Sequence, residues 1–154
     1  MKIKQGILYD EQIKIIEWAF KYFKHLTNED YFYALLKQET NWDISIKLVN
    51  ESDELMGVYL FGNKQLSSLI KNTKYDQFNG VEGVLLAVDS SIRGQGWGNK
   101  LKDFPATLGF DYIWGQQLKN LNNIDDWLKR RILIGETHGC YITLEDFLKK
   151  NLHN

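Results

Sequence analysis

The sequence predicts a single domain of mixed α/β structure, with helices around a sheet whose first half is largely antiparallel. Two observations favour this fold class. The spacing of apolar residues changes near Trp42 from steps of three and four to steps of two. A continuous apolar run over residues 84–88 is typical of a strand buried on both faces. The length of 154 residues is usual for one domain, so residues 1–154 are expected to form one.

The first forty residues predict a short strand followed by two helices. Residues 3–8 suit the strand, and from Glu11 onward the apolar residues recur with the helical period. Asp10 is the predicted N-cap of the first helix, and Thr27 or Asn28 caps the second. The inner face of the second helix is expected to carry Tyr31, Leu35 and Leu36.

A hairpin and the buried strand are expected next. Residues 44–48 alternate between apolar and polar, residues 50–53 form a turn cluster, and residues 55–61 form the returning strand. A single helical turn is expected around residues 66–70, ahead of the apolar strand at 84–88.

The second half of the chain predicts two more helices and three strands. A glycine-dense segment leads into a short helix through Leu101, which Pro105 and Gly109 limit. A strand is expected over residues 111–118. The remaining elements are a helix that Asn122 or Asn123 caps and that runs to Arg131, and a strand pair over residues 132–136 and 140–144.

The composition argues against several classes of protein. The formal net charge is −1, so we expect no general attraction to nucleic acid or to anionic membranes. The single cysteine, Cys140, and the widely spaced histidines predict neither an internal disulfide nor a metal site. The N-terminus lacks the apolar run of a signal peptide, and nowhere are eighteen consecutive residues apolar. The expected location is therefore cytoplasmic.

The segment that carries chemistry is Arg93-Gly94-Gln95-Gly96-Trp97-Gly98, between the apolar strand and a helix. Glycines allow a ligand to approach the main chain closely. The free N–H groups and the dipole at a helix start favour an anion there, and Arg93 adds a fixed positive charge. The segment therefore predicts a phosphate-binding turn, although a plain strand-to-helix turn is the alternative.

Two nucleotide-binding patterns do not fit this segment. The Walker pattern requires Gly-Lys followed by Ser or Thr, whereas Asn99 follows Gly98. The dinucleotide pattern G-x-G-x-x-G would need glycine at position 99 or 101, and Leu101 occupies the latter.

The segment instead resembles the acetyl-CoA signature Q/R-x-x-G-x-G/A of the GNAT superfamily of N-acetyltransferases. The resemblance covers residues 82–101 specifically and the order of elements along most of the chain. It implies a mixed, mostly antiparallel central sheet flanked by helices, with two splayed strands at residues 83–88 and 111–117. It also implies acetyl-CoA as co-substrate, held by Leu86, Ala87, Val88, Arg93, Gly94, Gln95, Gly96, Trp97, Gly98, Asn99 and Asn123.

The resemblance also suggests the catalytic groups. A lysine-like amine has a pKa of ~10.4, so its deprotonation at pH 7 costs roughly 4.6 kcal/mol and a general base helps. Glu82 lies at a position similar to that of the glutamate base in the histone-acetyltransferase branch, and burial would raise its pKa. The alternative for Glu82 is a solvated carboxylate. The family's tyrosine acid is missing, and its substitutes could be Tyr112 and Tyr141, or both could be core or rim aromatics.

The predicted function is acetyl-CoA-dependent N-acetyl transfer to a primary amine, directly within a ternary complex and with Glu82 as general base. The acceptor is an amine of a small molecule or of a protein. The main alternative is a catalytically inactive acyl-CoA-binding sensor or interaction module of the same fold, and a ligand-free interaction domain is a third. The oligomeric state stays open, with a homodimer through the last strands as one candidate.

Overall fold

The structure is a computed structural model that describes residues 1–121 and 123–148. Its elements follow the order that the sequence predicts. The strands are β1 (Lys2–Gln5), β2 (Ile46–Val49), β3 (Leu55–Gly62), β4 (Gly80–Val88), β5 (Tyr112–Leu118), β6 (Ile132–Thr137) and β7 (Cys140–Asp146). The helices are α1 (Tyr9–Phe20), α2 (Glu29–Glu39), α3 (Trp97–Thr107) and α4 (Ile124–Lys129), with 3₁₀ turns η1 (Leu66–Ser68), η2 (Lys74–Gln77) and η3 (Ser90–Ile92).

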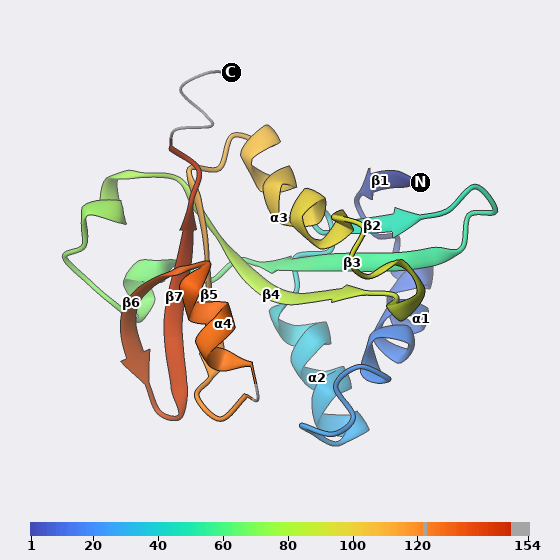
Figure 1. The fold of residues 1–154 in the computed structure, drawn as a ribbon, viewed down its shortest axis with the longest axis horizontal. Helices are drawn as coiled ribbons and strands as arrows, with labels where there is room; N and C mark the ends of the chain where they lie inside the picture. The colour runs from blue at the N-terminus through green and yellow to red at the C-terminus, as the bar shows by residue number, and fades with distance from the viewer. Residues whose placement is uncertain (122, 149–154) are drawn as a thin grey trace. The chain divides into compact units, whose positions relative to one another are not determined.

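The strands form one mixed sheet in the order β1-β2-β3-β4-β5-β7-β6 (Figure 1). The pairs β1–β2, β2–β3, β5–β7 and β6–β7 are antiparallel, whereas β4 and β5 are parallel. This confirms the predicted mixed, mostly antiparallel sheet flanked by helices. The parallel ladder joins β4 to β5 at Gly80, Val81 and Glu82, so β4 is tied to β5 through its first third.

The chain divides into two compact units. One holds residues 1–63 and 83–103, and the other holds residues 64–82 and the chain from 104 onward. Strand β4 passes from the second unit into the first immediately after Glu82. The phosphate-binding turn predicted at residues 93–98 therefore belongs wholly to the first unit.

The first unit buries one face of β3 and β4 under two helices. Since side chains alternate along a strand, Gly57 faces away from its buried neighbour Val58. A β-carbon at Gly57 would stand 3.3 Å from Leu101 of α3, which shows that α3 covers the other face (Figure 1). The core beneath α1 and α2 contains Ile15, Ile16, Ala19, Phe32, Leu36, Val58, Leu60, Leu85 and Ala87.

Burial along the end of β4 differs from the prediction of a strand buried on both faces. Leu85 and Ala87 are buried in the core, whereas Val84, Leu86 and Val88 are only half-buried. The five residues are uniformly apolar, but the strand still presents alternate side chains to opposite faces, and only one face carries the α1–α2 core.

Both N-terminal helices begin close to their predicted starts. In α1 the N-cap is Leu8 rather than Asp10, and the Glu11 carboxylate accepts a hydrogen bond from the Leu8 N–H at 3.3 Å. The side chain of Glu11, the third residue of the helix, thus provides a hydrogen-bond acceptor for the backbone N–H of the cap residue Leu8. In α2 the side chain of Asn28 accepts from the Tyr31 N–H at 2.8 Å, which confirms Asn28 as the cap.

The predicted inner face of α2 is wrong at two of its three positions. Tyr31 and Leu35 are exposed, and the buried residues are Phe32 and Leu36. Phe32 packs between the rings of Phe20 and Phe23, with centroid distances of 5.4 and 5.7 Å. The tertiary partners at the end of α1 therefore decide which stripe of this aromatic-rich helix turns inward.

Helix α3 is longer than predicted, because it continues through Pro105 to Thr107. A proline inside a helix removes one hydrogen bond, in this case to the carbonyl of Leu101. Leu101, Pro105 and Ala106 are buried, so packing of this face offsets the lost bond. The chain leaves the helix at Gly109, whose φ of 86° is readily accessible to glycine.

The second unit is built on β5 and the hairpin of β6 and β7. The predicted strand pair and its turn at Gly139, where φ is 72°, are confirmed. Turn η1 falls within the residues predicted to hold a helical turn, whereas η2 was not predicted. The core of the second unit consists of Leu66, Tyr75, Tyr112, Trp114, Ile142 and Leu144.

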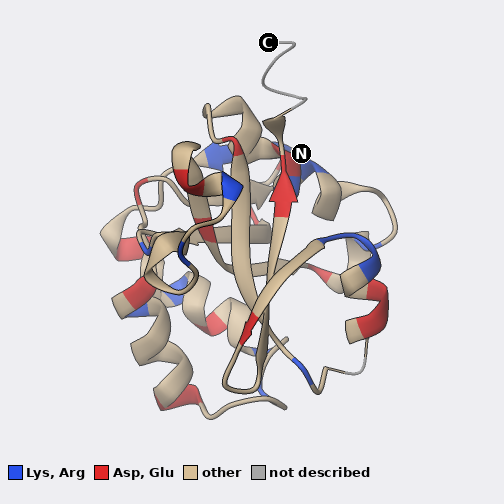
Figure 2. Ribbon diagram, turned by 90° about the vertical axis from the view of Figure 1, so that its left-hand side faces the viewer, with Lys and Arg blue, Asp and Glu red and all other residues tan. Residues whose placement is uncertain are grey.

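The surface carries charges of both signs. On the face shown in Figure 2, acidic and basic segments are interspersed, in keeping with the formal net charge of −1. Within the described part of the chain, no helix is long and apolar enough to cross a membrane.

Candidate functional site: a glycine turn at the start of α3

The turn between η3 and α3 exposes its main chain. Gly94 and Gly96 have φ values of 80° and 85°, in the left-handed region that disfavours other residues. A β-carbon added at Gly94, Gly96 or Gly98 would meet no heavy atom within 4 Å. The three glycines therefore do not make room for the protein's own packing, and the space beside their backbone is open to a ligand.

The turn ends at the N-terminus of an 11-residue helix. The Lys100 N–H donates to the Gly96 carbonyl at 3.1 Å, which sets Gly96 at the start of the helical bonding. The amides of the first helical turn lack partners within a helix, and the helix dipole makes this end positive. The N–H groups of Trp97, Gly98 and Asn99 are thus suited to an anion.

Arg93 stands at the entrance of the turn and is held on two sides. Its Nε donates to the Val88 carbonyl at 3.4 Å, and its guanidinium carbon lies 5.2 Å from the centroid of the Tyr22 ring. A guanidinium has five N–H donors, and four of them are on the two terminal nitrogens. The hydrogen bond to Val88 uses the Nε–H of Arg93. The two terminal nitrogens of the guanidinium can therefore bind a bidentate partner such as a phosphate.

Asp89 connects this turn to the end of α1. One carboxylate oxygen accepts from the Ser91 N–H at 2.9 Å and from the Ser91 hydroxyl at 2.6 Å. The other accepts from the Tyr22 hydroxyl at 3.4 Å and lies 3.8 Å from the Lys21 ammonium. The hydrogen bond from the Ser91 hydroxyl is the largest cause that lowers the pKa of Asp89, followed by the Ser91 N–H. Asp89 is therefore a carboxylate at neutral pH.

The β4 residues predicted to hold the cofactor arm lie just before this turn. The Ala87 side chain is buried in the core, whereas Leu86 and Val88 are half-buried. The Val88 carbonyl already accepts from Arg93. The turn from Arg93 to Asn99 and these three strand residues thus belong to one unit of the protein.

Glu82, the predicted base, is a buried residue of the second unit. It is 8% exposed and lies opposite Trp114, itself 1% exposed, at the last position of the β4–β5 ladder. The side chain is therefore not the solvated carboxylate of the alternative interpretation.

The two tyrosines proposed as acids occupy different environments. Tyr112 is 4% exposed and packs on Tyr75 with a centroid distance of 5.4 Å, and burial raises the pKa of its hydroxyl. Tyr141 is half-buried on β7, and the Lys119 ammonium lies 5.2 Å from its ring centroid. Tyr112 is therefore a core residue as well as a candidate acid.

Asn123 precedes α4 at the N-cap position, but its side chain makes no capping hydrogen bond. Asn122, the other predicted cap, lies outside the described residues. Glu82, Tyr112, Tyr141 and Asn123 all belong to the second unit, whereas the predicted phosphate-binding residues belong to the first. Residues 1–121 and 123–148 contain no group of three or more His, Cys, Asp or Glu side chains that could hold a metal ion.

Sequence reasoning missed the contribution of Tyr22 and Lys21 to the surroundings of the turn. The only local signal was Asp89-Ser90-Ser91, a polar run that identifies a turn but not its distant partners. Residue 22 is separated from residue 89 by 67 positions, so no spacing in the sequence could have paired them.

Acetyltransferases are among the solved structures with a similar fold. A GNAT-family acetyltransferase from Listeria monocytogenes matches with a TM-score of 0.68 at 10% identity, over 94% of both chains. A PaiA N-acetyltransferase from Thermoplasma acidophilum, in complex with coenzyme A, matches with a TM-score of 0.62 at 10% identity, over 95% of this chain and 99% of the other.

An aminoglycoside 6'-N-acetyltransferase complexed with coenzyme A matches with a TM-score of 0.58 at 13% identity, over 95% of this chain and 97% of the other. No protein-family model and no curated protein sequence matches this chain. At such low identities the likeness concerns the fold, which is that of the GNAT acetyltransferases.

Proposed function

We propose that this chain, which has the fold of the GNAT acetyltransferases, transfers an acetyl group from acetyl-CoA to a primary amine. The observation that carries the proposal is the bare main chain at Gly94 and Gly96, directly ahead of the N-terminus of α3. Two of the similar structures were determined with coenzyme A, which supports the same ligand for this turn.

The diphosphate of the co-substrate would bind at the turn. The Arg93 N–H already donates to the Ser90 carbonyl at 3.5 Å, so the amides from Gly94 to Asn99 would supply the hydrogen-bond donors, and the helix dipole adds a favourable potential. The free guanidinium edge of Arg93 supplies a charge-assisted pair of donors. Gln95, Trp97 and Gly98 would contribute through their backbone, so replacing the side chain of Gln95 or Trp97 should change affinity less than adding a β-carbon at Gly94 or Gly96.

The pantetheine arm would run beside Leu86, Ala87 and Val88. Backbone groups of a strand can bind such an arm as they would bind a neighbouring strand. Because the Val88 carbonyl accepts from Arg93, the arm would depend on the remaining peptide groups of this segment. Asn123 would contribute an amide side chain, since no capping hydrogen bond holds it.

Glu82 would act as the general base. The amine nitrogen forms a bond to the acetyl carbon, the bond from that carbon to sulfur breaks, and coenzyme A leaves as a thiolate. The amine proton passes to the Glu82 carboxylate, directly or through water. A proton from Tyr141 or Tyr112 would neutralise the thiolate. The raised pKa of Tyr112 makes this hydroxyl a weak donor, and a thiol with a pKa of about 8.5 is a tolerable leaving group without an acid.

The acceptor class is a primary amine of a small molecule or a protein, and the transfer is direct within a ternary complex. Glu82 is the feature that favours an enzyme over an inactive acyl-CoA-binding module, because a carboxyl group is otherwise poorly accommodated among buried residues.

Calorimetric titration with coenzyme A tests the binding half of this proposal. Wild-type protein should bind, and Gly96→Asp should weaken binding at least tenfold, since it adds strain at positive φ and a negative charge beside the diphosphate. The matched control is Gly139→Asp, which also replaces a glycine of positive φ with open space around it but lies in the β6–β7 turn. Absence of heat with wild-type protein, or equal affinity for Gly96→Asp, would overturn the proposal.

Release of coenzyme A, measured with a thiol reagent, tests the catalytic half. The acceptor panel should contain a polyamine, an aminoglycoside and peptides with a free N-terminus or a lysine. Turnover with one member supports the transferase, whereas binding without turnover on any amine favours the inactive module.

A further inference from the structure

We propose that Tyr22 and Asp89 are positioning residues that hold Arg93 in place for the diphosphate, so that the end of α1 forms part of the co-substrate site. This inference rests on the proposed function. It assigns a role to two residues that the signature Arg93-Gly94-Gln95-Gly96-Trp97-Gly98 does not include, and it concerns a contact between segments 67 positions apart.

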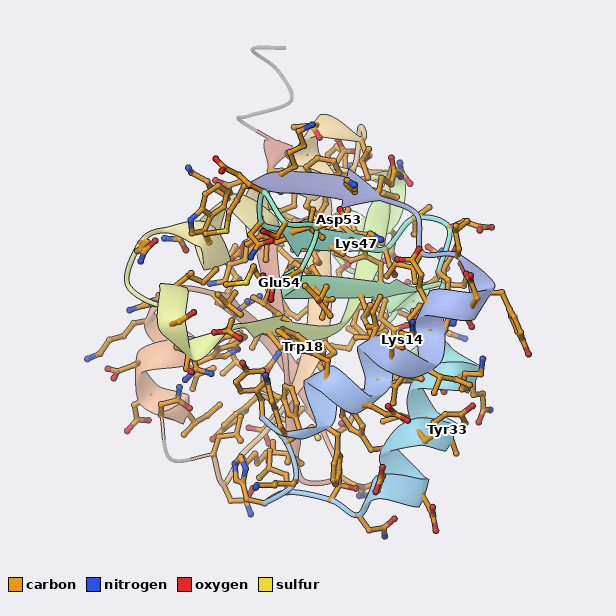
Figure 3. The ribbon with its side chains drawn as sticks, turned by 90° about the vertical axis from the view of Figure 1, so that its right-hand side faces the viewer. Lys14, Trp18, Tyr33, Lys47, Asp53 and Glu54 are labelled. Atoms are coloured by element: carbon orange, nitrogen blue, oxygen red, sulfur yellow. The ribbon has the colours of Figure 1, made fainter. Side chains whose placement is uncertain are left out.

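The Tyr22 ring is the surface on which Arg93 lies. The guanidinium carbon is 5.2 Å from the ring centroid, within the range of a cation–π interaction. Tyr22 is half-buried and packs against the α1–α2 core, and Trp18 meets it edge to face at 5.3 Å. Figure 3 shows Trp18 on α1. The ring is therefore fixed by the core, whereas the Arg93 side chain is exposed and depends on external contacts for its orientation.

Asp89 fixes the other end of the same contact. Its carboxylate accepts from the Tyr22 hydroxyl at 3.4 Å and from both donors of Ser91. The residues that it joins thus flank Arg93: Tyr22 lies beneath the guanidinium, and turn η3 leads into the Arg93 backbone. The Asp89 N–H in turn donates to the Met56 carbonyl of β3 at 2.8 Å, which anchors the carboxylate to the sheet.

The charges around this contact explain why a carboxylate is tolerated beside an anion site. Lys21 lies 3.8 Å from Asp89, and its ammonium is 4.9 Å from the Tyr22 ring centroid. Asp89, Lys21 and Arg93 therefore sum to one positive charge. The net field favours a diphosphate, and the aspartate orders the two cations around one aromatic ring.

The test is a double-mutant cycle on coenzyme A affinity, measured by calorimetry. Tyr22→Leu removes the ring and the hydroxyl and should weaken binding about tenfold. Tyr22→Phe removes only the hydroxyl and should weaken it about threefold. In an Arg93→Gln background, both substitutions should change affinity less than twofold, because their effect is transmitted through the guanidinium.

The matched control is Tyr9→Leu, since the Tyr9 ring at the start of α1 also carries a cation, with the Lys37 ammonium 4.8 Å from its centroid. Its affinity for coenzyme A should equal that of the wild type. Losses that are the same with and without Arg93 would overturn this inference while leaving the proposed function intact. A wild-type protein that does not bind coenzyme A would overturn both.

Discussion

The ring of Tyr112 lies directly against the backbone of Gly80, its partner across the parallel β4–β5 ladder. A β-carbon at Gly80 would stand 2.0 Å from Cζ of Tyr112 and 2.5 Å from its hydroxyl oxygen. Only glycine leaves room for the ring, so the first residue of β4 determines how Tyr112 enters the core with Tyr75.

Gly80→Ala should therefore destabilise the protein by about 1–3 kcal/mol, because the ring must move or the strands must separate. Urea unfolding measures the change. Gly98→Ala is the control, since open space surrounds Gly98 in α3, and alanine there should be neutral or stabilising by up to about 1 kcal/mol. If the clash is the cause, Tyr112→Leu should reduce the penalty of Gly80→Ala. A penalty that stays the same beside leucine would disprove it.

Tyr112 should also make the protein less stable in strong alkali. Burial, and secondarily Asp76 and Asp111, raise the pKa of the folded tyrosine above its ordinary value of 10.0. The folded state keeps this proton at pH values where the unfolded state releases it, so the free energy of unfolding falls as pH rises through 10.0 toward the raised pKa.

Urea unfolding between pH 9 and pH 11, in roughly half-unit steps, measures this dependence. Tyr112→Phe should show a shallower decline than the wild type, whereas Tyr9→Phe, at an exposed position, should follow the wild type. If the free energy of unfolding fell equally steeply with pH in all three proteins, Tyr112 would not be the cause of the decline.

Glu11 should contribute its full stabilisation above its unfolded pKa and lose it gradually at lower pH. The Lys47 ammonium donates to its carboxylate, which is the largest cause that lowers the pKa of Glu11 from 4.5. Lys47 is on β2 (Figure 3), so this pair joins α1 to the sheet. Because the folded pKa is depressed, the stabilisation is complete above pH 4.5 and is lost as pH falls through the lower, folded value.

Glu11→Gln retains an acceptor for the Leu8 N–H but removes the charge. It should lower the free energy of unfolding by about 0.5 kcal/mol at neutral pH. This difference from wild type should disappear once the pH is below the folded pKa of Glu11. Glu17→Gln, exposed on the same helix, serves as the control and should have no such pH-dependent effect. A constant deficit at every pH would mean that Glu11 acts through something other than its charge.

Glu82→Gln should lower kcat at neutral pH by at least about 100-fold and leave the affinity for coenzyme A unchanged. The deficit should shrink as pH approaches the pKa of the acceptor amine, because a larger fraction of the amine is then already neutral and needs no base to deprotonate the ammonium. A deficit that stays constant with pH would show that Glu82 supports the fold rather than the proton transfer. Initial rates on the amine identified by the panel measure this.

Local patterns were sufficient to predict much of the backbone. The alternation at residues 44–48 and the turn at His138 and Gly139 identified both hairpins, because a hairpin depends on neighbouring residues. The extent of α3 was not predictable in this way. Pro105 normally ends a helix, and the burial of Leu101 and Ala106, which outweighs that tendency, depends on partners elsewhere in the chain.

The same distinction holds for the candidate site. The spacing of Gly94, Gly96 and Gly98 indicated exposed main chain, and the structure has it. The support for Arg93 comes from Tyr22, in the turn that follows α1, and no local pattern at either residue predicts the contact. Motifs describe the atoms that touch a ligand, whereas the residues that fix those atoms are chosen by the fold.

Strand β6 is the last strand in the sheet order, and its side chains Ile132 and Leu133 are 44% and 49% exposed. An edge strand with open amides and apolar side chains can recruit another chain in concentrated solution, and natural proteins often guard such edges with lysine. Self-association of purified samples would thus begin at the β6 edge. Leu133→Lys would be the substitution to make before crystallisation or NMR is attempted.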